Sequence, residues 1–181
     1  DPARNAVGAY LDICGTLDRA AVDRQARSYG FTPIPRDPTA SHGNTIYAPS
    51  EQGGPLGVVS WNDMDRRCSL IVGGVDRAAL EQAFLGQIAA FERAAELRVE
   101  RLGAAELAEI NRSSRGDFAL RQAAVIGVRV AGAGRGTVWS FHVRQTPDPL
   151  PNLNRLDVQM TRAPAGSLPP NVGDAQAVSR I

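Results

Sequence analysis

The sequence contains no lysine, and all twenty of its basic residues are arginines. Nineteen acidic residues nearly balance them, which gives a formal charge of +1, and no run of like charge exceeds three residues. A nucleic-acid-binding protein needs a basic face, so this even distribution argues against that class of partner. We attribute the arginine bias to the source genome, because arginine alone does not make a phosphate site.

Long apolar runs are also absent. No segment approaches the roughly 18 to 20 apolar residues that a membrane-spanning helix needs, so no membrane span is predicted. The chain begins at Asp1 without a methionine, which fits either a mature protein after signal-peptide removal or a trimmed chain. With 43% hydrophobic residues in 181, we expect a single α+β domain over residues 1–162, with a possible sub-division near 99–116. Residues 163–181, which contain three prolines, are expected to form an extended or disordered tail.

The chain has only two cysteines, Cys14 in an expected helix and Cys68 at the start of an expected strand. No Cys-x-x-Cys motif and no nearby histidine accompanies them, so no metal site is predicted. A structural disulfide is the favoured interpretation, worth up to about 4 kcal/mol in the chain-entropy model. Such bonds persist in oxidising compartments, which favours the periplasm or secretion. The alternative is two buried free thiols in a cytoplasmic protein.

The clearest element is a helix that begins after Asp76 and follows the strand 68–72. Apolar residues recur at helical spacing along it, and polar residues fall on the opposite side. The apolar set is Leu80, Phe84, Ile88, Phe91 and Ala95. Asp76 can cap the first turn while Val75 packs on Leu80 as a hydrophobic staple. We therefore expect this long helix to lie across one face of a sheet.

Alternating apolar residues and turn signals predict the rest of the fold. Strands are expected over 45–48, 56–61, 68–72, from 118 to about 130, over 137–144 and over 156–160. Two further helices are expected after Asp1 and Asp18, the second ending at Gly30. The segment 99–102 is compatible with a helix extension or a short strand, and 104–110 with a short helix. The predicted fold class is α+β, with a mainly antiparallel sheet of about six strands, the long helix on one face and the N-terminal helix pair tied to the sheet by the disulfide.

In the order of its features, the first half of the chain resembles exported proteobacterial proteins of uncharacterised function. These carry one cysteine in an N-terminal helix and another at the start of a strand. The residues that carry the resemblance are Cys14, Gly30 to Pro33 after a helix, Trp61 and Cys68 to Leu70. The resemblance implies export and a disulfide, but it implies no activity.

His142 is the candidate for chemistry, because strand alternation places it on one face with Arg144 and near Asp148 of the following loop. A histidine oriented by a carboxylate is typical of a general base. The alternative is a half-exposed histidine on the solvent side of a sheet. No Gly-x-Ser-x-Gly motif, reactive cysteine or His-x-x-x-His spacing accompanies it.

Trp61 and Trp139 are candidates for a binding surface, since tryptophan combines a large apolar area with one hydrogen-bond donor. The alternative, and the more common role of such residues, is plain packing. Our first hypothesis is a non-enzymatic exported domain that binds another protein, as an accessory subunit, an inhibitor or an envelope component, without a cofactor. The alternatives are a small hydrolase with its site around His142, and a small-molecule carrier. The carrier would have an apolar pocket between helix and sheet, lined by Phe84, Phe91 and the two tryptophans.

Overall fold

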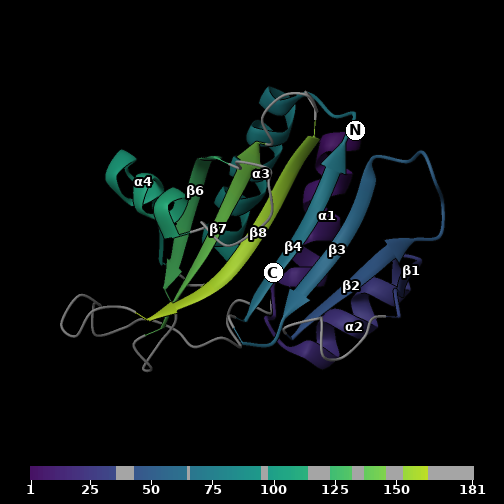
Figure 1. Ribbon diagram of the computed structural model, residues 1–181. Helices are drawn as coiled ribbons and strands as arrows, with labels where there is room; N and C mark the ends of the chain where they lie inside the picture. The colour runs from purple at the N-terminus through teal and green to yellow at the C-terminus, as the bar shows by residue number, and fades with distance from the viewer. Residues whose placement is uncertain are drawn as a thin grey trace.

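The computed structural model describes residues 1–35, 43–64, 66–94, 98–113, 123–131, 137–145 and 153–162. These residues form an α+β fold around a sheet of eight strands in the order β1-β2-β3-β4-β8-β7-β6-β5, in which every neighbouring pair is antiparallel. Figure 1 shows the helices on the far side of the sheet and α4 beside its β6 end. The α+β class and the mainly antiparallel sheet are thus confirmed.

The helices are α1 (Pro2–Cys14), α2 (Arg19–Ser28), α3 (Arg77–Ala94) and α4 (Ala104–Ser113). The strands are β1 (Phe31–Pro33), β2 (Asn44–Pro49), β3 (Leu56–Asn62), β4 (Arg67–Gly73), β5 (Arg98–Arg101), β6 (Ala123–Ala131), β7 (Thr137–Gln145) and β8 (Leu153–Arg162).

Three aspartates start helices, as expected from the sequence. Asp1 Oδ1 accepts a hydrogen bond from the Ala3 N–H at 2.9 Å, and Asp18 Oδ2 accepts one from the Ala21 N–H at 2.9 Å. At the start of α3, the Ala79 N–H donates to Asp76 Oδ2 at 3.1 Å. Each carboxylate satisfies an amide that has no partner within its helix, and it also favours the positive end of the helix dipole.

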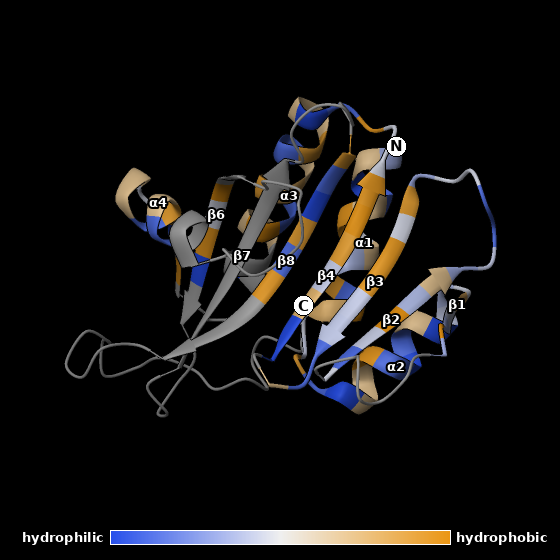
Figure 2. Cartoon of the chain, viewed as in Figure 1, coloured by the Kyte–Doolittle hydropathy of each residue, from blue (hydrophilic) through white to orange (hydrophobic). Residues whose placement is uncertain are grey.

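The hydrophobic core lies between the sheet and the helices α1 and α3. Strand alternation turns Val59 of β3, Leu70 of β4 and Val158 of β8 toward this core, where all three are fully buried. α1 contacts β4 and β8 in the middle of the sheet, and α3 packs beside α1. Figure 2 shows the apolar residues that recur along β3, β4 and α1. Leu80, Phe84 and Ile88 of α3 are buried in the same core.

The order of strands has an internal symmetry. β1 to β4 run from one edge of the sheet to its middle, and β5 to β8 run from the other edge to the same place. The two sets meet at β4 and β8, where Leu70 is paired with Leu156. The strands after residue 118 therefore extend the first sheet rather than forming one of their own. The division of the chain at 162 and near 99–116 stays a prediction.

The strand count differs from the expected six because the two edge strands are short. β1 has three residues and ends in Pro33, while β5 has four, of which only Val99 is apolar. Strand alternation does not reveal β1, and at β5 it does not separate a short strand from a helix extension. The long helix also ends at Ala94, and the helix that contacts the central strands β4 and β8 is α1. In β6 the register shifts between Ala124 and Ile126, which marks a local irregularity of the strand.

The predicted disulfide is present and joins Cys14, the last residue of α1, to Cys68 of β4. Their Cα atoms lie 5.4 Å apart, which is within the range that a disulfide spans. Both cysteines are fully buried. The bond therefore ties the N-terminal helix to the middle of the sheet. Among the described residues, no helix has the length and apolar character that crossing a membrane requires.

Candidate functional site

In the part of the chain that the structure describes, two places bring together side chains that could serve a function. The first is a row of polar residues on the sheet face that points away from α1 and α3. Ser60 of β3 is paired with Ser69 of β4, and Ser69 is paired with Asp157 of β8. The two serine hydroxyls are hydrogen-bonded to each other. Next in the row is His142 of β7, which is paired with Asp157.

Asp157 is the centre of this row and is fully buried. Its Oδ1 accepts a hydrogen bond from Arg155 Nε at 2.7 Å, and the Arg155 side chain is only 11% exposed. On the core side, the Tyr10 hydroxyl donates to the Asp157 main-chain oxygen. Burial and the nearby Asp157 charge raise the pKa of Tyr10 well above its usual value, so Tyr10 remains a neutral donor. The row is a buried network whose charges are compensated, as burial requires.

His142 and Arg144 both lie in β7, two residues apart and therefore on one side of the strand, as expected. Asp148 lies outside the described residues. The carboxylate that the strand register brings to His142 is Asp157, which comes from a distant part of the sequence. Ser69 is two strand positions from His142, about 9.5 Å at the usual spacing, which is too far for direct proton transfer between them. The hydrolase hypothesis stays a prediction.

The aromatic residues predicted to line a binding surface or an apolar pocket lie in different parts of the fold. Trp61 is buried, and its Nε1 donates to Asp63 Oδ1 at 2.8 Å. Phe84 is fully buried, with its ring centroid 6.5 Å from that of Tyr10. Trp139 is paired with Val130 and Met160 in the sheet. The side chains of Phe91 and Trp139 lie outside the description. Trp61 and Phe84 thus serve as packing residues in the core.

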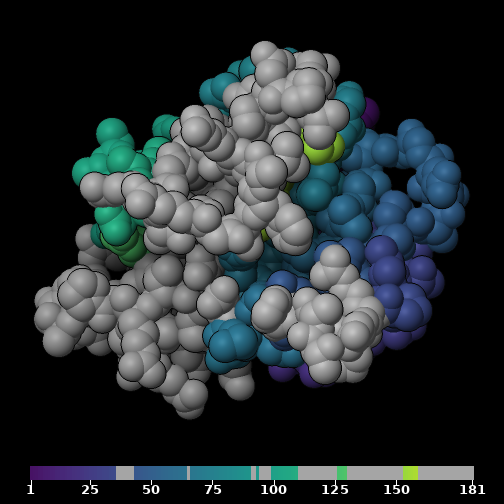
Figure 3. All heavy atoms as spheres, viewed as in Figure 1, coloured from purple at the N-terminus to yellow at the C-terminus, as the bar shows by residue number. Residues whose placement is uncertain are grey.

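The second place is a groove of about 490 Å³ at the β1 edge of the sheet. It lies between the first half of α1, the end of α2 and the segment that joins β2 to β3. Figure 3 shows this segment, in blue at the right-hand side, arching around an opening. The lining residues are Asn5, Ala6, Ser28, Tyr29, Gly30, Phe31, Pro49, Ser50, Glu51, Gly54, Pro55 and Leu56. The volume falls within the range of about 300 to 1,000 Å³ that is usual for ligand pockets.

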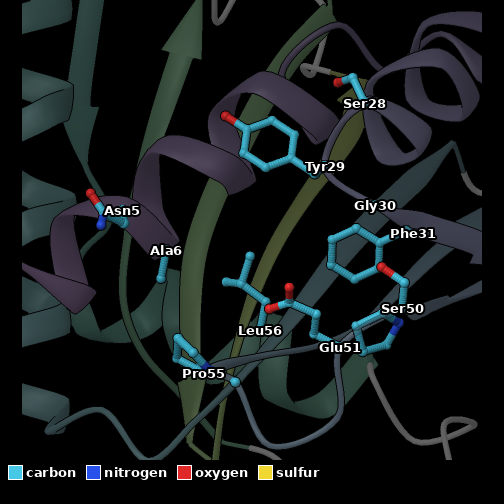
Figure 4. A pocket seen from close by; sticks show the side chains of 12 residues that line it. Asn5, Ala6, Ser28, Tyr29, Gly30, Phe31, Ser50, Glu51, Pro55 and Leu56 are labelled. Carbon is cyan, nitrogen blue, oxygen red and sulfur yellow. The ribbon is translucent and has the colours of Figure 1, made fainter.

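The groove has an apolar floor and a polar rim. Ala6 and Phe31 are buried beneath it, and Leu56 is half-buried. Ser50 and Glu51 form the rim on the β2–β3 side, and Figure 4 shows the Glu51 carboxylate turned toward Leu56. An apolar floor with a few polar groups at one side is the common construction of a binding site.

Gly30 fixes the shape of the groove at the point where α2 ends. Its φ of +84° belongs to the left-handed region, which a side chain makes costly. A Cβ at this position would also lie 2.9 Å from Ser50 Oγ. The Gly30 carbonyl oxygen accepts a hydrogen bond from the Ser50 N–H at 3.0 Å. This close approach of the two backbones joins the end of α2 to the start of the β2–β3 segment.

Two tyrosines in this region are held by carboxylates. The Tyr29 hydroxyl donates to Asp12 Oδ2, and the Tyr47 hydroxyl donates to Asp23 Oδ1 at 2.9 Å. Burial, followed by these hydrogen bonds, raises the pKa of each tyrosine to about 12. The hydrogen bond from Arg27 lowers the pKa of Asp23. At neutral pH the ring of Tyr29 is therefore neutral and anchored, with 41% of the residue exposed beside the groove.

Neither place has the ligands of a metal ion. Within the described ranges, no group of three or more histidine, cysteine, aspartate or glutamate side chains could hold one. No protein-family model, curated protein or solved structure matches this chain.

The sequence did not predict the groove. It identified Glu51 to Pro55 only as a turn and Gly30 only as a helix stop. No local sequence pattern indicates that this turn faces α1. The turn and the helix come close only because α1, linked by the disulfide, packs against the sheet. The one signal was Tyr29, an aromatic residue directly after the mostly polar helix α2, which fits an exposed position next to a surface groove.

Proposed function

We propose that this chain is a non-enzymatic exported domain that binds another protein, and that the groove between α1 and the β2–β3 segment is its binding surface. The observation that carries the proposal is the combination of an apolar floor, an anchored aromatic side chain and a polar rim in one open groove. Protein interfaces typically place an aromatic residue and apolar contacts at the centre and polar groups around them. Tyr29, Leu56 and Ser50 supply these three parts.

The contrast with the polar row favours binding over catalysis. The charge of Asp157 is buried and compensated by Arg155, so the network supports the fold. The groove is open, and its polar groups come from exposed residues. A partner can reach the groove without any rearrangement of the core.

Export is proposed from the disulfide between Cys14 and Cys68, which is compatible with an oxidising compartment. Thiol trapping in intact cells of the source organism tests this part. A reagent that alkylates free thiols should leave both cysteines unmodified until the protein is denatured and reduced. Alkylation after denaturation alone, without reductant, would show free thiols and contradict export.

Binding is tested with two substitutions that add the same side chain in different places. Gly54→Trp places an indole in the groove, where a Cβ meets no atom within 4 Å. Gly86→Trp is the matched control: this glycine lies exposed on α3, a Cβ there also meets no atom within 4 Å, and it does not line the groove. Both variants should melt within a few degrees of the wild type.

The three proteins are immobilised and incubated with an envelope extract of the source organism. We expect the wild type and the control variant Gly86→Trp to retain one protein in similar amounts. The amount retained by Gly54→Trp should be at least tenfold lower. Equal retention by Gly54→Trp would show that the groove is not the binding surface. Retention by none of the three, relative to bare resin, would contradict protein binding.

A further inference from the structure

The groove contains a single charged residue. Of its twelve lining residues only Glu51 carries a formal charge, and it is exposed. Within the described part of the chain, its carboxylate makes no hydrogen bond or ion pair, and the same holds for the side chains of Ser50 and Asn5. The acceptors of Glu51 are therefore available to a group that enters the groove.

The first half of α1 lines the groove, so the start of this helix could in principle attract an anion there. A free helix N-terminus attracts anions. Here, however, Asp1 accepts hydrogen bonds from the Ala3 and Arg4 amides, at 2.9 and 3.5 Å, and supplies its own negative charge. The Asp1 carboxylate therefore offsets part of the positive potential at the helix start, and the charge of Glu51 favours a cationic group.

The apolar surface around Glu51 restricts the kind of cation. Leu56 and Ala6 form an apolar surface beside the carboxylate, which suits a cation carried on an aliphatic stem. The Tyr29 ring lines the same groove, and its hydrogen bond to Asp12 holds the ring in place. A planar guanidinium can stack on such a ring and bind a carboxylate through two parallel hydrogen bonds, whereas an ammonium cannot do both equally well.

We propose that the groove receives an arginine side chain presented by the partner protein. Its methylene stem lies on Leu56 and Ala6, and its guanidinium pairs with the Glu51 carboxylate next to the Tyr29 ring. This inference rests on the proposed function, because it names the chemistry of the partner that the groove binds. The groove is larger than one side chain, so the neighbouring backbone of the partner has room to enter with the arginine.

The test uses three small probes that differ in charge and shape. They are the N-acetyl, N-methylamide derivatives of arginine, of citrulline, which has nearly the same shape without the charge, and of norleucine, which has only the apolar stem. Each is titrated into the isotopically labelled full chain while NMR records the backbone amides. We expect the arginine probe to shift the amides of Ser50, Glu51 and Leu56, with an affinity about fivefold higher than that of citrulline, as one partly exposed ion pair provides.

Glu51→Gln should remove this preference, so that arginine and citrulline bind equally weakly. Glu81→Gln, on α3, is the control and should leave the preference intact; Glu81 pairs with Arg77 and does not line the groove. Equal binding of arginine and citrulline by the wild type would overturn the proposal, and so would a preference that survives in Glu51→Gln.

The two proposals fail in different ways. If Gly54→Trp abolishes retention of a protein but the arginine probe shows no preference, the groove binds a protein by other chemistry. If the arginine preference is present and depends on Glu51 but no protein is retained, the guanidinium site is real and the proposed protein binding is wrong.

Discussion

Glu51 in the groove and Asp157 in the polar row both carry a carboxylate, but the two side chains differ in burial and in pairing. Asp157 is fully buried and paired with Arg155, while Glu51 is exposed and has no partner among the described residues. A buried charge must be compensated within the protein, so the polar row serves the fold. An exposed, uncompensated charge beside apolar surface is available to a ligand. The comparison thus separates a structural network from a binding surface.

The largest effect on stability is expected from loss of the disulfide that ties α1 to β4. Replacing Cys14 and Cys68 together by serine removes a cross-link between residues 54 positions apart. The free energy of unfolding should fall by about 4 kcal/mol in the chain-entropy model. Urea unfolding of wild type and double variant measures it, with the reduced wild type as the control. Equal free energies of unfolding would mean that packing alone holds α1 on the sheet.

The second prediction compares the stability effects of the two carboxylates, each replaced by its amide. Asp157→Asn removes the carboxylate charge that pairs with the buried Arg155 and should destabilise the protein by about 3 kcal/mol. Glu51→Gln should change stability by less than about 0.5 kcal/mol, because an exposed residue without a partner contributes little. Thermal and urea unfolding measure both. A comparable loss in the two variants would remove the distinction between row and groove.

The third prediction concerns two glycines of the groove. Gly30→Ala places a side chain at a φ of +84° and brings a Cβ within 2.9 Å of Ser50 Oγ. We expect a loss of about 1 to 2 kcal/mol from the left-handed backbone alone. Gly54→Ala is the control, since a Cβ there meets no atom within 4 Å, and it should be close to neutral. If Gly30→Ala unfolded at the same urea concentration as Gly54→Ala, Gly30 would not fix the groove wall.

The smallest effect is expected at high pH. The pKa of Tyr29 is raised to about 12, so the neutral phenol is favoured by folding. This contribution to stability is fully present below the unfolded pKa of about 10 and is lost as the pH rises through about 12. Tyr29→Phe should therefore show a shallower decline in stability between pH 10 and 12 than the wild type. An unchanged decline would assign it to other groups, with Tyr47 the first to test because its pKa is also about 12.

The sequence predicted the parts of the fold that depend on local patterns. The aspartate caps, the helix stop at Gly30, the central strands and the disulfide all followed from residue spacing or residue type. The edge strand β1 did not, and β5 was only one of two interpretations of residues 99–102, because strands of three and four residues are too short to show alternation. Neither did the pairing of His142 with Asp157, since it depends on β8 entering the sheet between β4 and β7.

The groove was missed for a similar reason. Its walls come from α1, the end of α2 and the turn before Leu56, which are brought together only by tertiary packing. Glu51 within a glycine-rich turn has no local signal of function.

The central claim is that a partner protein contacts the groove, and photo-crosslinking tests it most directly. The photoreactive residue p-benzoylphenylalanine is placed at Gly54 in one variant and at Gly86 in another, and each is irradiated in the envelope extract. We predict a covalent adduct of one defined mass from position 54 and none from position 86. An adduct from position 86 alone, or no adduct from position 54, would contradict the claim.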